Sequence, residues 1–111
     1  DFAYIHVEAP DEMGHQGSYE RKVQAIENLD SRVIKLVVEQ MNASGEDYRM
    51  LVLPDHPTPI RVRTHTSDSV PYLLYDSRQN LGNGLTYCEE DAKKGPFVEK
   101  GHTIIDKLFA E

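Results

Sequence analysis

The chain has 111 residues, a length that fits one domain with a modest core. Its formal net charge of −7 argues against a nucleic-acid partner, which would need a basic surface. The single cysteine, Cys88, allows no internal disulfide, and no apolar run approaches membrane-spanning length. We therefore expect one domain over residues 1–111 that is soluble and cytoplasmic and binds neither nucleic acid nor membrane.

The first residues have the composition of a strand. Phe2 to Val7 mix aromatic and β-branched side chains, which predicts a buried strand. An irregular loop is expected to follow at residues 8–17, because Pro10, Gly14 and Gly17 interrupt regular structure there. The chain enters the strand-like run at once, with no Met and no leader. This start indicates a piece of a longer polypeptide.

A long helix is the clearest element in the pattern. Ser18 is a plausible N-cap, and Glu20 is favourably placed in the first turn. Asn42 to Gly45 end the helix. Between these limits apolar residues recur at helical spacing, at Val23, Ile26, Leu29, Val33, Leu36, Val37 and Met41.

The second half predicts two further strands and a final helix. The strands are expected over residues 48–53 and 70–75, and the helix over residues 100–110. A long functional loop over residues 54–69 separates the strands, and a surface loop is expected over residues 76–96. The alternation of strand and helix predicts an α/β fold with a mainly parallel sheet and helical cover.

Two short stretches carry carboxylate and imidazole groups close together. Asp11 and His15 are four residues apart, so one helical turn would place both side chains on one side. Asp55 and His56 are adjacent and are followed nine residues later by His65. Both stretches follow predicted strands, and ligand sites in open α/β sheets lie beyond the carboxyl ends of strands. We therefore expect the five side chains to converge.

Each of these residues also has an ordinary structural role open to it. Asp11 suits a helix cap, Asp55 suits a turn, and the histidines suit a solvated surface. Five Asp and His side chains at one sheet edge nevertheless favour a site for two divalent cations. Carboxylate and imidazole together suit Mn²⁺, Zn²⁺ or Fe²⁺ better than Ca²⁺. Two such ions roughly 3.5–4 Å apart hold the attacking and leaving oxygens in displacements at phosphorus.

The remaining histidines and the serines near these stretches receive structural interpretations. His6 lies inside the predicted strand and is interpreted as a packed residue, and His102 as a surface or capping residue. Ser67 and Ser69 lie near His65 but are interpreted as turn residues. The sequence therefore predicts metal ligands without a recognisable nucleophile beside them.

Three motifs, in this order, resemble a known family. Pro10-Asp11-Glu12-Met13-Gly14-His15, the segment from Leu53 to Pro59, and the segment from Arg63 to Pro71 are similar to the C-terminal metal-binding portion of cofactor-independent phosphoglycerate mutase. The archaeal-type branch of that family, within the alkaline phosphatase superfamily, is the best match. The resemblance covers nearly all of residues 1–75 and, more loosely, the C-terminal helix.

The resemblance implies an alkaline-phosphatase-like core and a set of ligands. Asp11, His15 and His65 would hold one Mn²⁺ and Asp55 and His56 the other, with Zn²⁺ or Mg²⁺ as alternative ions. In the family an aspartate and a nucleophilic serine near the N-terminus complete the second site. That serine becomes phosphorylated as 3- and 2-phosphoglycerate are interconverted. The resemblance thus implies a fragment without its nucleophile, inactive by itself and missing the N-terminal part of the same polypeptide.

Two other functions remain open. The same ligands serve other phosphoryl-transfer enzymes of the superfamily, among them phosphatases, phosphodiesterases and a proposed homoserine kinase. This chain also carries Pro54 and Pro57 around Asp55 and His56, where many relatives have a small residue and then Gly or Ser. The second alternative is a small, non-catalytic metal-binding or interaction domain.

A fragment of a sheet would also expose apolar edges, so self-association is expected.

Overall fold

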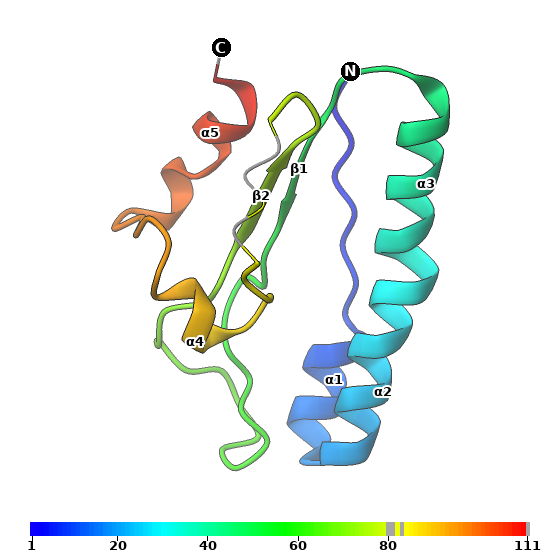
Figure 1. The fold of residues 1–111 in the computed structure, drawn as a ribbon. Coiled ribbons are helices and arrows are strands. Elements are labelled where there is room, and N and C mark those ends of the chain that lie inside the picture. The colour runs from blue at the N-terminus through cyan, green and yellow to red at the C-terminus, as the bar shows by residue number, and fades with distance from the viewer. Residues whose placement is uncertain (80–81, 83, 111) are drawn as a thin grey trace. The chain divides into compact units, whose positions relative to one another are not determined.

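The computed structural model describes residues 1–79, 82 and 84–110, which fall into two compact units. The helical unit comprises residues 1–45 and 56–68, and the strand unit comprises residues 46–55 and 69–111. Figure 1 shows the elements of both units along the chain. No helix within the described part of the chain has both the length and the apolar character needed to cross a membrane.

The N-terminal residues 1–8 are extended but form no strand, so the buried strand predicted over residues 2–7 is wrong for this structure. Phe2 is 52% exposed and Tyr4 is 76% exposed. A strand requires a paired neighbouring strand, and the described strand pairing joins residues 49–52 to residues 73–76. Composition alone predicted the strand, but it carries no information about a pairing partner.

A helix, α1 (Ala9–Gln16), replaces the irregular loop expected over residues 8–17. Pro10 stands in the first turn, where its missing N–H is not needed, and acidic residues follow it near the helix N-terminus. Gly17 ends the helix with φ 71°, and its N–H donates to the carbonyls of Gly14 and Met13. Two of the three residues interpreted as loop signals, Pro10 and Gly17, therefore lie at the start and the end of a short helix.

The long helix predicted from Ser18 to Gly45 is confirmed. It consists of α2 (Tyr19–Leu29), one π-helical stretch (Asp30–Ile34) and α3 (Lys35–Ser44), and Figure 1 shows it as one continuous rod. The Ser18 side chain accepts a hydrogen bond from the Arg21 N–H, as an N-cap should. Gly45, with φ 74°, ends the helix.

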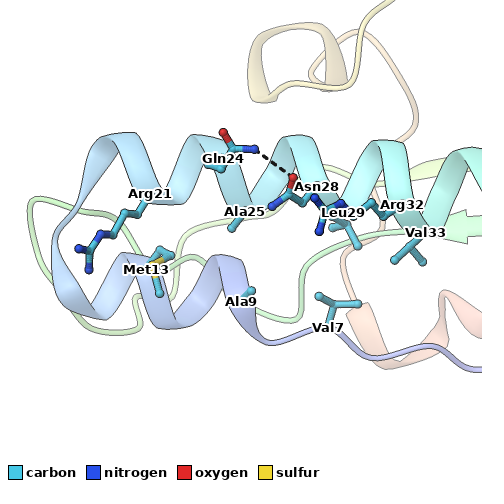
Figure 2. Close-up of a pocket in the computed structure, with 10 residues that line it drawn as sticks. All are labelled: Val7, Ala9, Met13, Arg21, Gln24, Ala25, Asn28, Leu29, Arg32 and Val33. Carbon is cyan, nitrogen blue, oxygen red and sulfur yellow. Dashed lines mark hydrogen bonds between the residues drawn. The ribbon is translucent and has the colours of Figure 1, made fainter.

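The helical unit has an open pocket of about 430 Å³ beside the long helix (Figure 2). Its walls come from the extended N-terminal segment, from α1 and from the long helix. The lining residues are Val7, Ala9, Met13, Arg21, Gln24, Ala25, Asn28, Leu29, Arg32 and Val33. Figure 2 also shows the hydrogen bond from Gln24 Nε2 to Asn28 Oδ1, 3.0 Å long, on the same helix. Among the described residues no hydrophobic side chain is fully buried.

The strand unit is built on an antiparallel pair, β1 (Arg49–Val52) and β2 (Leu73–Asp76). The strands predicted over residues 48–53 and 70–75 are thus present. The second strand begins and ends later in the chain than predicted, at Leu73 and Asp76. Arg49 lies opposite Asp76 in the register, and its Nε donates to Asp76 Oδ2 at 2.9 Å. A mainly parallel sheet remains a prediction, because these two strands neither confirm it nor conflict with it.

Short helices complete the strand unit. Within the surface loop predicted over residues 76–96 lies α4 (Glu89–Ala92), while residues 80, 81 and 83 of that loop are outside the described part. The predicted final helix is present as a 3₁₀ turn (Gly101–Thr103) followed by α5 (Ile105–Phe109). Arg49 donates hydrogen bonds to the carbonyls of Leu108 and Ala110, which ties the C-terminal residues to β1.

Candidate metal centre

Three of the five predicted ligands meet in the helical unit. His15 Nε2 lies 3.3 Å from Asp11 Oδ2, and His65 Nε2 lies 3.3 Å from Asp11 Oδ1. The two imidazole nitrogens are 3.2 Å apart. One ligand atom from each residue lies within 4.8 Å of the others, an arrangement that can hold a metal ion. The convergence expected from the sequence is therefore present for these three side chains.

The local fold explains why they meet. Asp11 and His15 are four residues apart on α1, so one turn brings both side chains to the same face. His65 comes from the segment of residues 56–68, which belongs to the same unit. The side chains of Asp11, His15 and His65 are 36%, 42% and 49% exposed, so the cluster remains open to solvent.

The hydrogen-bond partners of His15 select its tautomer. Its Nδ1 lies 3.1 Å from the carbonyl oxygen of Arg63, which can only accept. Nδ1 therefore carries a proton and donates it, and Nε2 is the nitrogen that faces Asp11 and His65. Arg63 itself has φ 59°, an uncommon value for a residue other than glycine.

The Thr58 hydroxyl forms a hydrogen bond with the Asp11 carboxylate. Thr58, only 4% exposed, donates from its hydroxyl to Asp11 Oδ1 at 2.5 Å. This hydrogen bond is the main reason that the pKa of Asp11 lies below its usual value; partial burial opposes it, and the neighbouring imidazoles of His15, His65 and His56 add to it. Asp11 is therefore held as an anion, the form that binds a cation.

The remaining two predicted ligands are placed differently. The His56 ring stacks on His65 with centroids 3.5 Å apart and an interplanar angle of 29°. Its Nδ1 lies 3.4 Å from the Thr58 hydroxyl oxygen. Asp55 belongs to the strand unit, so its part in the same centre stays a prediction.

The donor set and its spacing fit a divalent cation. Metal–ligand bonds of about 2.1 Å place neighbouring ligand atoms roughly 3.0–3.4 Å apart in octahedral or tetrahedral coordination. The separations of 3.2 and 3.3 Å between the ligand atoms of Asp11, His15 and His65 fall within that interval. Two imidazole nitrogens and a carboxylate suit Mn²⁺, Zn²⁺ and related ions.

Sequence reasoning missed the residues that support the cluster. Thr58 and Lys22 were not singled out, yet Lys22 Nζ donates to the Thr58 carbonyl at 2.6 Å. One signal was available in Gly14, which lies between Asp11 and His15 and is the buried residue of α1. A glycine between two ligands indicates close approach by another segment. Nothing in the pattern identified which segment it would be.

The protein family that the chain matches consists of metalloenzymes, as a metal centre would require. The whole chain, residues 1–111, matches the metalloenzyme superfamily. The chain therefore belongs to that superfamily, in agreement with the alkaline-phosphatase-like class expected from its motifs. Divalent metal binding follows from this membership together with the cluster of Asp11, His15 and His65. No solved structure matches the chain significantly.

Three relatives show which enzymes the chain is similar to. The chain is 47% identical over 94 residues to the 2,3-bisphosphoglycerate-independent phosphoglycerate mutase of Methanosarcina acetivorans, a match that covers 85% of this chain and 24% of the relative. It is 43% identical over 111 residues to a protein from Geobacter sulfurreducens named a probable mutase of the same kind, covering 98% of this chain and 28% of the relative. A mutase from Aeropyrum pernix is 35% identical, covering 99% and 26%. The resemblance stated from the motifs is thereby confirmed. The chain spans about a quarter of the length of these relatives.

Proposed function

We propose that the chain is the C-terminal metal-binding part of a cofactor-independent phosphoglycerate mutase, which interconverts 3- and 2-phosphoglycerate. The convergence of Asp11, His15 and His65 on one point carries this proposal. The names of relatives at 35–47% identity supply the substrate. A glycolytic reaction on a phosphorylated small molecule also suits the cytoplasm.

In this proposal the five predicted ligands serve two divalent cations. Asp11, His15 and His65 hold one ion, and Asp55 and His56 contribute to the other, with Mn²⁺ as the preferred metal and Zn²⁺ or Mg²⁺ as alternatives. The ions supply positive charge beside the phosphoryl oxygens, which an acidic chain cannot supply by itself. Hydrogen bonds with the Thr58 hydroxyl and the Arg63 carbonyl orient Asp11 and His15 before substrate arrives.

The proposal leaves the nucleophile to another part of the polypeptide. In the resembling family this group is a serine near the N-terminus, which carries the phosphoryl group between the two hydroxyls of glycerate. We expect the 111-residue chain by itself to have no mutase activity. The substrate and the N-terminal part of the same polypeptide are then its partners.

The other functions left open by the sequence are less well supported. A homoserine kinase, phosphatase or phosphodiesterase would use the same ligands, but the relatives of the chain are named as mutases or as a probable mutase. A non-catalytic interaction domain would not need ligand atoms spaced for one cation, and a non-catalytic metal-binding domain is less well supported because the relatives are named as mutases. Both remain as outcomes of the experiment below.

The test uses the protein expressed from its complete reading frame with Mn²⁺. Conversion of 3-phosphoglycerate is coupled to enolase, and Asp11→Ala and Asp55→Ala are compared with Asp106→Ala, an acidic residue on α5. We expect turnover that is lost in the first two variants and kept in the third. Metal binding without turnover would reject the mutase and direct assays to homoserine and phosphomonoesters. Failure to bind metal would reject the metal centre.

A further inference from the structure

We infer that Thr58 is a positioning residue that sets the metal-ligating atoms of Asp11 and His56 through one hydroxyl group. The inference rests on the proposed function, because it assumes that these two residues ligate metal. It goes further in assigning a role to a residue that ligates nothing and that bridges the ligand sets of the two proposed ions.

The first step is the hydrogen bonding of the Thr58 hydroxyl. It has one proton and donates it to Asp11 Oδ1 at 2.5 Å. Its oxygen lies 3.4 Å from His56 Nδ1, and with its own proton engaged it can only accept there. The His56 Nδ1–H is thus the donor, so the hydroxyl fixes the orientation of the His56 ring, and Nε2 is the nitrogen that would ligate a cation.

The second step is the effect on Asp11. Its two oxygens face different partners, with Oδ1 toward Thr58 and His65 and Oδ2 toward His15. The hydroxyl therefore fixes the rotation of the Asp11 carboxylate about its Cβ–Cγ bond. Removing this bond frees that rotation, and the carboxylate must then be ordered when the cation binds.

The third step is that Thr58 is itself held firmly. Lys22 Nζ donates to its carbonyl oxygen at 2.6 Å, which ties the segment to α2. From α1, Gly14 approaches so closely that a Cβ there would lie 2.5 Å from the same oxygen and 3.0 Å from Thr58 Cγ2. Thr58 is also only 4% exposed, so water cannot readily replace its hydroxyl. The supporting contacts come from two helices, and a residue held in this way can orient its neighbours.

The experiment measures Mn²⁺ affinity by calorimetry, using the metal alone and the protein from its complete reading frame. Thr58→Val keeps the shape and removes the hydroxyl, whereas Thr58→Ser keeps the hydroxyl. We expect Thr58→Val to weaken Mn²⁺ binding about 10- to 100-fold and Thr58→Ser to stay within about threefold of the unmodified protein. Thr86→Val is the matched control, because Thr86 donates to Asp91 and not to the cluster.

A second variant guards against misfolding of Thr58→Val. Lys22→Met keeps the stem and removes the donor to the Thr58 carbonyl, with Lys35→Met, from an exposed ion pair on α3, as its control. We expect Lys22→Met to bind Mn²⁺ at least about threefold more weakly than the unmodified protein. The control, Lys35→Met, should bind Mn²⁺ with unchanged affinity. Unchanged affinity in Thr58→Val would overturn the inference; should that variant fail to fold, unchanged affinity in Lys22→Met would overturn it. An unmodified protein that binds no Mn²⁺ would instead overturn the proposed function.

Discussion

His15 Nε2 lies 3.2 Å from His65 Nε2, although 50 positions separate the two residues in the chain. Two imidazole nitrogens at this distance need a shared proton or a cation beside them, because otherwise their lone pairs repel. The His15 proton is already engaged at Nδ1 by the Arg63 carbonyl. A cation would satisfy both lone pairs at once, and the separation of 3.2 Å is that of two nitrogens bound to one ion.

Replacing either histidine should remove the same ion. We expect His15→Ala and His65→Ala each to weaken binding of one Mn²⁺ by at least about 100-fold, because each removes a direct ligand. The double variant should lose the same single ion rather than a second one, since both residues ligate one ion in this proposal. Calorimetric titration measures this, with His102→Ala as the control in the strand unit. Loss of two different ions in the two single variants would mean that the two residues do not share an ion.

Gly14 should tolerate no side chain. An added Cβ would meet the Thr58 carbonyl oxygen at 2.5 Å, so either α1 or the Thr58 segment must move. We expect Gly14→Ala to weaken Mn²⁺ binding about tenfold or more, even though alanine favours a helix by about 1 kcal/mol over glycine. Gly101→Ala is the control, because a Cβ there meets nothing within 4 Å. Equal metal affinity in both variants would show that the close approach is not required.

The sequence predicted elements well where a local signal was sufficient. The apolar spacing and the Ser18 cap specified the long helix, and Asp11 and His15 at a separation of four specified a shared face. The prediction was wrong where partners decide. Phe2 to Val7 have strand composition but form no strand. The antiparallel pairing of β1 with β2 leaves the mainly parallel sheet a prediction.

The supporting residues of the site were missed for a related reason. Nothing in the sequence pattern distinguishes Thr58 and Lys22 from other residues of their type. Their role arises only when a loop and two helices come together. Pro10 and Gly17 were interpreted as loop signals, although the same residue types start and end helices. Family motifs predicted the ligands, but only tertiary contacts show which residues hold these side chains in place.

Asp76 should make the strand unit sensitive to acid. Hydrogen bonds from Arg78 and then Arg49 hold the pKa of Asp76 far below its ordinary value of 3.8. A depressed pKa in the folded state means that the stabilisation is complete above about pH 4 and is lost as the pH falls toward the folded pKa. We expect Asp76→Asn to lower the melting temperature at pH 7 and to flatten the loss of stability below pH 4. Asp106→Asn is the control, and identical acid profiles for Asp76→Asn and the unmodified protein would contradict this role.

The 111-residue chain expressed by itself should associate with itself. Among its described residues no hydrophobic side chain is fully buried, and Tyr4 and Phe97 are 76% and 77% exposed. Burial of apolar surface is the main stabilising contribution to folding, so these side chains favour contact with other copies over contact with water. We expect analytical ultracentrifugation to show oligomers that grow with concentration, and the protein from the complete reading frame to lack this behaviour under the same conditions. A clean monomer of the short chain at high concentration, with a cooperative thermal transition, would show that its exposed apolar surface needs no cover.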